Sequence, residues 1–316
     1  MERNLALELV RVTEAAALYA SRQMGRGDAD MADFSACEAM VKAFVSVSIR
    51  GEIIIGEKNN GHGLLKQGTL VGNGTGSEAD IVLDPLDGKT TCANGGGNAL
   101  SAIAMGEKGS MLPAPRIYME KIAVGPEARG VVDITQPPEI NIKRIARAMD
   151  KYIEDVTVCI LDRERHGDLI KSIRKTGARI KLINDGDISG AIAAAMPEKS
   201  IDILIGVGGA MEGVIAAAAV KCLGGDMQAR FVYRDDEDRR MVREMGEKNL
   251  DRIYGINDLA RGSIVFAATG VTSGELLPGV GYFSGGARTN SIVMREKTRT
   301  LRFISTVHHF DYKPMY

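Results

Sequence analysis

Apolar and polar residues alternate along the start of the chain with the spacing of amphipathic helices. The first twenty residues place apolar side chains every three or four positions, which predicts a helix that ends near residues 25–28. A second helix is expected to begin near Asp33, whose carboxylate suits a helix N-terminus, and to run towards Arg50. The apolar run over residues 53–55 then predicts a buried strand that ends just before Glu57.

Farther along, the pattern changes from separate strands to a regular alternation of helices and strands. A glycine-rich stretch leads to a predicted strand that stops at Asp84. The predicted strands are 80–83, 98–105, 118–124, 156–161, 179–183, 201–205, 263–268 and 289–295, and the predicted helices are 140–149, 166–176, 188–195, 211–223 and the charged segment 234–249. Alternation from about residue 138 is typical of βαβ units and a parallel sheet. The chain is therefore predicted to be layered α/β, with a division near residue 135.

Composition limits the classes of partner. The 316 residues suffice for one large or two modest domains with a substantial core, and 45% of them are hydrophobic. The 40 Lys and Arg residues nearly balance the 41 Asp and Glu residues, so no global field favours nucleic acid or an anionic membrane. Trp is absent, which argues against a base-stacking platform. A phosphate ligand must therefore be captured by a local cluster of charges.

The N-terminus and the cysteines indicate an ordinary intracellular chain. Acidic residues interrupt the first apolar stretch, so it is predicted to be neither a signal peptide nor a membrane span, and a cytoplasmic location is expected. Cys37, Cys92, Cys159 and Cys222 are scattered singly beside small or apolar residues. This spacing predicts buried, reduced thiols.

The segment Asp84-Pro85-Leu86-Asp87-Gly88 carries the strongest chemical signal. Its two carboxylates follow an apolar strand and can converge on one hard cation, because Pro85 restricts φ and Gly88 lets the chain turn away. Carboxylate oxygens of this kind suit Mg²⁺ or Mn²⁺. The alternative is an ordinary surface turn, because Asp-Pro and Asp-Gly are frequent turn dipeptides.

Two further carboxylates lie at comparable positions. Glu57 follows a buried strand and a glycine, and Glu212 follows the glycine-rich end of another strand, at a helix start. Such strand ends are where α/β sheets bind ligands. Glu212 alone could instead stabilise the helix N-terminus, by roughly 0.3–1 kcal/mol. Taken with Asp84 and Asp87, these residues predict a metal site.

Motifs along nearly the whole chain are similar to those of a known family. They are LVRVTEAAAL, GRGD and AD within residues 9–33, IIGE (54–57), DPLDG (84–88), NAL (98–100), YMEKIAVGPEA (118–128), RIKLINDGD (179–187), GVGGAMEGV (206–214), ATGVT (268–272) and RTLRFI (299–304). In these motifs the chain resembles the class II fructose-1,6-bisphosphatases, some of which also hydrolyse sedoheptulose 1,7-bisphosphate.

This resemblance implies a fold and an activity. The expected fold is the α/β sugar-phosphatase fold, an inositol monophosphatase-like layered α-β-α-β-α sandwich. Residues 1–135 would form a metal-binding α+β half, and residues 136–316 an α/β half that completes the substrate site. The implied reaction is Mn²⁺- or Mg²⁺-dependent removal of the 1-phosphate from fructose 1,6-bisphosphate in gluconeogenesis. The resemblance also implies a homodimer or homotetramer.

The resemblance also implies roles for individual residues. Metal ligands are expected at Asp33, Glu57, Asp84, Asp87 and Glu212, and catalytic roles at Glu57, Asp84, Lys89 and Thr90. Substrate contacts are expected at Asp87, Gly88, Lys89, Tyr118, Arg163, Glu164, Arg165, Asp185, Gly186, Asp187 and Gly209. The chemistry agrees, because paired arginines suit a distal phosphate and paired aspartates on a glycine turn suit sugar hydroxyls. Apart from the resemblance, these charges would also fit an exposed turn. His166 is expected to be a phosphate neighbour or a helix-start residue.

Two segments differ from the family pattern. The loop after Glu57 reads KNNGHGLLKQG at residues 58–68 and lacks the acidic residues usual there. Lys89 stands where the family has Thr, and Asp87 replaces the commoner Glu. The Lys89 ammonium can either contact the scissile phosphate or replace part of a metal's charge. Thr90 can supply a hydroxyl that orients the attacking water.

Three functional hypotheses follow. The first is an active fructose-1,6-bisphosphatase, based on the complete set of carboxylates. The second is a phosphatase for another sugar bisphosphate or for an inositol phosphate, based on the altered loop. The third is a catalytically weakened paralogue that binds sugar phosphate or a partner protein in a regulatory role, based on Lys89 and the same loop.

Overall fold

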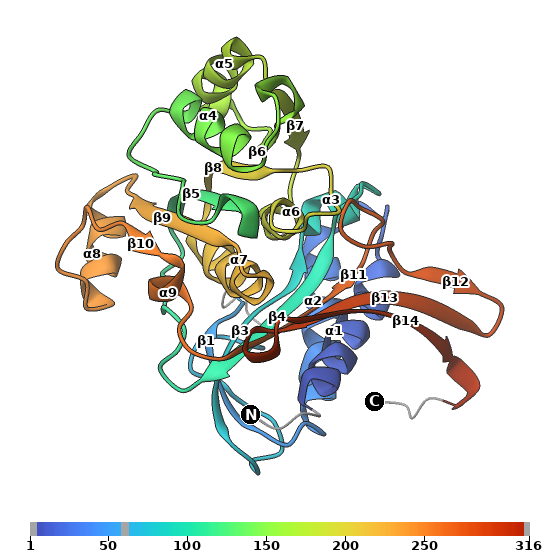
Figure 1. Cartoon of the computed structure of the whole chain (residues 1–316). Helices are drawn as coiled ribbons and strands as arrows, with labels where there is room; N and C mark the ends of the chain where they lie inside the picture. The colour runs from blue at the N-terminus through green and yellow to red at the C-terminus, as the bar shows by residue number, and fades with distance from the viewer. Residues whose placement is uncertain (1–4, 58–62, 313–316) are drawn as a thin grey trace. The chain divides into compact units, whose positions relative to one another are not determined.

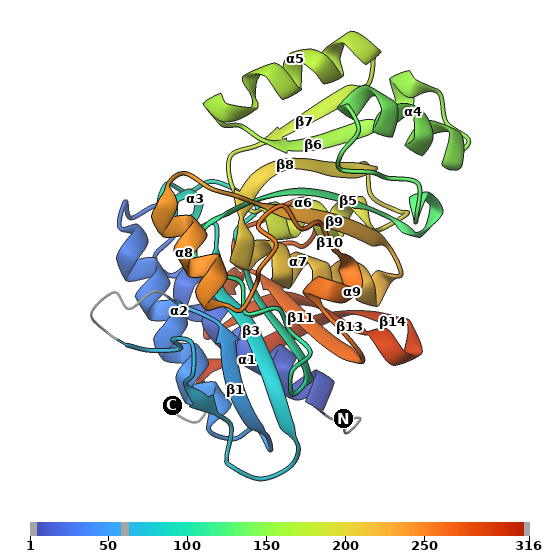
Figure 2. The same cartoon turned by 90° about the vertical axis from the view of Figure 1, so that its left-hand side faces the viewer.

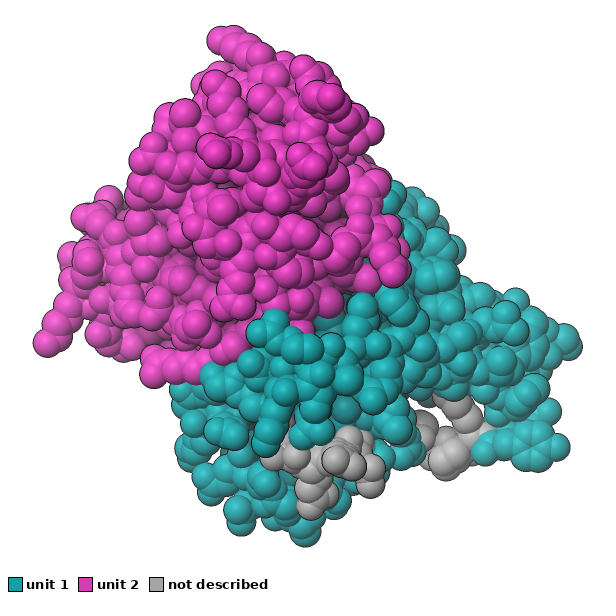
Figure 3. Space-filling model, in the orientation of Figure 1, with its two compact units in different colours: residues 1–111, 262–316 teal, residues 112–261 magenta. Residues whose placement is uncertain are grey.

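The computed structural model describes residues 5–57 and 63–312, and its contacts divide the chain into two compact units. Unit 1 combines residues 1–111 with 262–316, and unit 2 comprises residues 112–261 (Figure 3). These limits differ from the predicted division near residue 135. The difference arises because the last strands of the chain return to the sheet that the first strands form.

Unit 1 contains an eight-stranded sheet with the order β12-β13-β11-β4-β3-β1-β2, in which β14 also pairs with β13. The strands are β1 (Arg50–Ile55), β2 (Leu70–Val71), β3 (Glu78–Asp87), β4 (Leu100–Glu107), β11 (Ile264–Gly270), β12 (Gly281–Phe283), β13 (Gly286–Arg295) and β14 (Thr300–His309). β1 and β3 are parallel, and the other neighbours are antiparallel. β12 and β14 were not anticipated from the sequence.

Two helices cover one face of this sheet, α1 (Leu5–Ser21) and α2 (Ala29–Phe44) (Figure 1). Leu9 and Met40 of the helices are fully buried in one core with Ile53 and Ile81 of the strands. Each such side chain contributes about 1.5–3 kcal/mol through burial. The apolar spacing of the first helix therefore reports its contact face correctly.

The start of α2 corrects a prediction. The helix begins at Ala29, and its cap is Asp28, whose Oδ1 accepts a hydrogen bond from the N–H of Met31 at 2.9 Å. Asp33, which was expected to lie near the helix start, is instead a buried residue of the helix body. Its carboxylate is therefore available for other contacts.

Unit 2 contains a six-stranded sheet with the order β10-β9-β5-β8-β6-β7. The strands are β5 (Tyr118–Val124), β6 (Thr157–Leu161), β7 (Arg179–Ile183), β8 (Ile203–Gly209), β9 (Asp226–Val232) and β10 (Tyr254–Gly255). β6 is parallel to β7 and β8, as the alternation predicted. The sheet is nevertheless mixed, because β5, β9 and β10 are antiparallel to their neighbours.

Helices cover both faces of this second sheet (Figure 2). α4 (Pro138–Ala148) and α5 (Gly167–Thr176) lie on one face and α6 (Asp187–Ala194) and α7 (Ala210–Leu223) on the other, while α8 (Asp236–Glu244) and α9 (Ile256–Leu259) follow later in the chain. The structure is thus α/β with two sheets, whereas the five-layer order implied by the resemblance stays a prediction. The four cysteines are buried thiols, as predicted. Within the described ranges, no helix combines the length and apolar composition needed to cross a membrane.

Candidate active site

Three side chains of unit 1, which we call the acidic cluster, meet between α2 and the C-terminal end of β1. One ligand atom from each of Asp33, Cys37 and Glu57 lies within 4.8 Å of the others. Asp33 and Cys37 are four residues apart on α2 and so share a helix face, and Glu57 follows the last residue of β1 by two positions. These atoms are close enough to surround one metal ion.

A β-bulge in β3 turns the two aspartates of the next motif towards one face of the sheet. β3 pairs with β4 at Asp84–Ala102 and again at Asp87–Leu100, so three steps along β3 match two along β4. Without the extra residue, side chains three positions apart would point to opposite faces. Asp84 Oδ1 also accepts a hydrogen bond from the N–H of Leu86 at 3.0 Å. The strand thus continues to Asp87 and does not stop at Asp84 as predicted.

The carboxylates act together on the thiol of Cys37. Burial raises the pKa of Cys37, and the negative charges of Glu57, Asp33 and Asp84 raise it further. Cys37 therefore remains a neutral thiol, and the carboxylate oxygens carry the charge of the site. An oxygen-dominated, negatively charged group of this kind suits a hard divalent cation.

Lys89 begins α3 (Lys89–Ala93), immediately after the bulged strand. Gly88 precedes it with φ 85°, a left-handed conformation that favours glycine. The Lys89 ammonium donates to Asp33 Oδ2 at 3.4 Å and to Asp30 Oδ1 at 3.3 Å. Burial opposes the charged form, but the carboxylates of Asp33 and Asp30 prevail and raise the pKa of Lys89. Thr90 is exposed on α3.

In unit 2, a buried lysine organises the end of β8. The ammonium of Lys121, whose side chain is 2% exposed, donates to Asp187 Oδ2 at 2.5 Å and to the carbonyl of Gly209 at 2.9 Å. A Cβ at Gly208 would collide with the Asp187 carboxylate, and one at Gly209 would collide with the carboxylate of Glu212. The two glycines therefore make room for the two carboxylates.

The acids of unit 2 are held close to one another. Burial and the nearby charge of Asp187 raise the pKa of Glu212, against the opposing charge of Lys121. Burial and Asp187 also raise the pKa of Asp185. Gly186 separates these two aspartates with φ 82°, so the predicted turn is present. Such crowding of carboxylates is typical of a site that binds a cation or a hydroxyl-rich ligand.

The imidazole ring of His166 is held between two backbone groups. Its Nδ1 lies 2.7 Å from the carbonyl of Leu161, and its Nε2 accepts a hydrogen bond from the N–H of Val207 at 2.8 Å. Both ring nitrogens are therefore engaged by the backbone, which fits a neutral imidazole with the proton on Nδ1. Burial lowers the pKa of His166, and the Arg165 guanidinium adds to the effect. His166 supports the ends of β6 and β8, at the helix start where it was expected.

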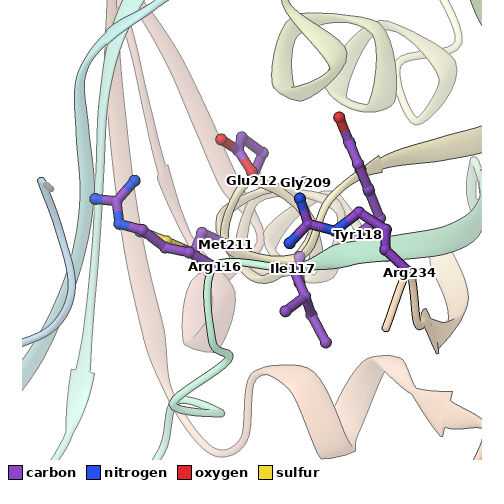
Figure 4. Close-up of a pocket in the computed structure, with 8 residues that line it drawn as sticks. Arg116, Ile117, Tyr118, Gly209, Met211, Glu212 and Arg234 are labelled. Atoms are coloured by element: carbon purple, nitrogen blue, oxygen red, sulfur yellow. The ribbon is translucent and has the colours of Figure 1, made fainter. Parts of the chain in front are cut away.

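A cavity of about 210 Å³ lies beside Gly209 and Glu212 (Figure 4). Its lining consists of Arg116, Ile117, Tyr118, Gly209, Ala210, Met211, Glu212 and Arg234. The guanidinium carbons of Arg165 and Arg234 lie 4.9 and 5.5 Å from the centre of the Tyr118 ring. Arg234 is held by a two-pronged ion pair with Asp238, at 2.8 and 2.9 Å. In the view of Figure 4, Arg116 and Arg234 lie on opposite sides of Glu212.

Comparison with known proteins agrees with this geometry. The family described as bacterial fructose-1,6-bisphosphatase, glpX-encoded, matches residues 3–308. The chain belongs to this family. A relative from Synechococcus sp. (strain JA-2-3B'a(2-13)) is 42% identical over 98% of this chain and 97% of its own. One from Microcystis aeruginosa (strain NIES-843 / IAM M-2473) is 40% identical over 100% of this chain and 99% of its own. Both are named D-fructose 1,6-bisphosphatase class 2/sedoheptulose 1,7-bisphosphatase.

Within each unit, the structure gathers residues that the family resemblance had selected. Unit 1 brings together Asp33 and Glu57, and the charge of Asp84 acts on the thiol of Cys37 between them. Unit 2 brings together Tyr118 with Arg165, and Asp187 with Gly209. Arg163 acts on the pKa of Asp185, whereas Glu164 is exposed in a short 3-10 helix. Residues 58–62 of the altered loop lie outside the described residues.

Sequence reasoning missed four residues of these clusters: Cys37, Arg116, Lys121 and Arg234. The first had a usable signal, because Cys37 follows Asp33 by one helical turn. Lys121 was also detectable, as a charge inside a strand whose later residues are all apolar. The two arginines join the cavity only through tertiary contacts, so no local pattern marks them.

Proposed function

We propose that this chain hydrolyses the 1-phosphate of fructose 1,6-bisphosphate to give fructose 6-phosphate, and that it also accepts sedoheptulose 1,7-bisphosphate. The observation that carries the proposal is the grouping of Asp33 and Glu57 around Cys37, where the charge of Asp84 also acts on the thiol. It occurs in a chain that is 42% identical to a relative named for both bisphosphatase activities. A purely structural group of carboxylates would cost stability through mutual repulsion.

The proposed cofactor is Mn²⁺ or Mg²⁺. The residues fit such an ion, because the acidic cluster offers two carboxylates within 4.8 Å of each other. We assign the ligands to Asp33, Glu57, Asp84, Asp87 and Glu212. When bound, the divalent ion would neutralise phosphate oxygens and lower the pKa of the attacking water.

The chain's own residues are proposed to bind and orient the sugar phosphate. Arg163 and Arg165 are assigned to the distal phosphate, since guanidinium groups form paired bonds to phosphate oxygens. Asp185 and Asp187 are assigned to sugar hydroxyls. The remaining proposed contacts are Asp87, Gly88, Lys89, Tyr118, Glu164, Gly186 and Gly209, and Thr90 is proposed to orient the attacking water. Lys121 holds Asp187 in place through their ion pair.

Wider features of the family resemblance complete the proposal. We assign the enzyme to gluconeogenesis in the cytoplasm, as a homodimer or homotetramer with the layered α-β-α-β-α fold. Unit 1 supplies four of the proposed metal ligands, and unit 2 supplies Glu212 and most substrate contacts.

Phosphate release tests this function. The full chain is incubated with fructose 1,6-bisphosphate and Mn²⁺ or Mg²⁺, beside a Glu57→Gln variant. We expect the variant to be slower by at least about 100-fold, because a metal ligand supplies several kcal/mol of transition-state stabilisation. Equal release from both proteins, or none from either, would overturn the proposal.

A second candidate function is regulatory binding of sugar phosphate by a weakened enzyme. The ion pair between Lys89 and Asp33 favours it, because this lysine occupies a carboxylate assigned to the metal. This function predicts that fructose 1,6-bisphosphate raises the melting temperature without being hydrolysed. Hydrolysis at a rate that Glu57→Gln abolishes would exclude it. A panel of sugar bisphosphates and inositol phosphates in the same assay would reveal a different substrate.

A further inference from the structure

The position of Lys89 is unusual for a residue next to a proposed metal site. Its ammonium lies 3.4 Å from Asp33 Oδ2 and 3.3 Å from Asp30 Oδ1. The side chain of Asp33 is 8% exposed and that of Asp30 is 90% exposed, so the lysine reaches from the surface inwards to the cluster. A permanent positive charge is thus held against a carboxylate of the acidic cluster.

The backbone fixes this arrangement. Lys89 directly follows the bulge that turns Asp84 and Asp87 to one face, and it begins α3 after the left-handed Gly88. The Gly88 carbonyl accepts a hydrogen bond from the N–H of Cys92 at 2.9 Å, which closes the first turn of α3. Lys89 and the bulged aspartates are therefore parts of one continuous, hydrogen-bonded segment.

A divalent ion on Asp33 and the Lys89 ammonium would be close neighbours. A cation bound to Asp33 Oδ2 at about 2.1 Å would lie no more than about 5.5 Å from an ammonium 3.4 Å from the same oxygen. Two positive groups at that separation repel each other, and solvent screens only part of the repulsion because Lys89 is 38% exposed and Asp33 is 8% exposed. Lys89 must then either weaken the binding of an ion there or be displaced by it.

We propose that the Lys89 ammonium supplies part of the positive charge that the carboxylates of the acidic cluster require. The chain then holds fewer divalent ions at this cluster than a variant that lacks the charge of Lys89. The inference rests on the proposed function only in taking the acidic cluster as a metal site. It makes Lys89 a residue that sets the metal requirement of this chain.

Mn²⁺ binding tests the inference without any turnover. The full chain is stripped with a chelator and titrated with Mn²⁺, and the free ion is counted by its electron paramagnetic resonance signal. We expect Lys89→Met to bind one more ion per chain than the unmodified protein, or to bind Mn²⁺ at least about tenfold more tightly. Lys89→Arg keeps the charge and should behave like the unmodified protein.

Lys42 provides a matched control. It also forms an ion pair in unit 1, with Glu38 at 3.2 Å one turn away on α2, but it lies outside the acidic cluster. Lys42→Met should therefore leave Mn²⁺ binding unchanged. Lys89→Gln is a second neutral variant, and far-ultraviolet circular dichroism identifies any variant that fails to fold.

The outcomes separate this inference from the proposed function. Equal ion counts and affinities within about twofold for the unmodified protein and both neutral variants would overturn the inference, even if bisphosphate is hydrolysed. An increase shared by Lys89→Arg would also overturn it, because size and not charge would then be responsible. An increase confined to the neutral variants supports it, even if no bisphosphate is hydrolysed.

Discussion

Lys121 offers a direct measure of how strongly unit 2 depends on its buried ion pair. Replacing it with Met keeps an unbranched side chain of similar length and removes the charge together with its N–H donors. The change leaves the Asp187 carboxylate and the Gly209 carbonyl without the ammonium that now contacts them at 2.5 and 2.9 Å. The side chain that is lost is 2% exposed, so water cannot easily take its place.

The expected loss of stability follows from that burial. Removing one partner of a buried ion pair costs about 3–5 kcal/mol, because the remaining charge is left uncompensated. For a chain of this size, each kcal/mol lowers the melting temperature by roughly 2–4 °C. Lys121→Met should therefore melt roughly 6–20 °C below the unmodified protein. Urea denaturation would give the free energy directly.

A matched pair elsewhere in unit 2 provides the control. Lys151 contacts Asp202 at the same distance, 2.5 Å, but the lysine side chain is 37% exposed. Lys151→Met should cost only about 1 kcal/mol, since solvent screens the pair. Adding Asp187→Asn to Lys121→Met should restore at least half of the lost stability by removing the orphaned charge. A cost below about 1 kcal/mol for Lys121→Met, or no recovery in the double variant, would refute the reasoning.

Three further predictions concern other parts of the structure. Gly209→Ala places a Cβ against the Glu212 carboxylate, so bisphosphatase activity should fall by at least about tenfold. Gly281→Ala, at an open glycine of β12 without a left-handed φ, should leave the activity unchanged. Equal activities of the two variants would contradict the assigned role of Gly209. Burial lowers the pKa of His166 in the folded chain, so the unfolded chain takes up the proton at a higher pH, and stability should fall as the pH drops below about 6.5. Urea titrations at several pH values should show a flatter pH dependence for His166→Asn. An unchanged pH dependence would contradict the role given to His166. Arg234→Ala removes the guanidinium beside Tyr118 and should raise KM for the bisphosphate by about tenfold with little change in kcat. Arg240→Ala, on the surface of α8, should change neither constant. Equal KM values for the two variants would exclude Arg234 from substrate binding.

Local patterns in the sequence were enough to locate most elements and one motif. The apolar face of α1 and the boundaries of β5 and β7 depend on residues that are close together in the sequence. The order of apolar and polar residues was therefore enough to predict them. The DPLDG motif was recognised because two carboxylates directly follow an apolar strand. The family resemblance, spread over the whole chain, selected residues that the structure then gathers within each unit.

Other features depended on pairing between distant segments. The bulge that turns Asp84 and Asp87 to one face exists only in the register of β3 against β4. β14 joins the first sheet although it comes last in the chain, which moved the division between the units away from residue 135. Lys121 is buried because strands on both sides and a distant aspartate enclose it. Periodicity describes which face of an element is apolar, but strand register and the partners of a buried charge are set by long-range contacts, and only the folded chain decides them.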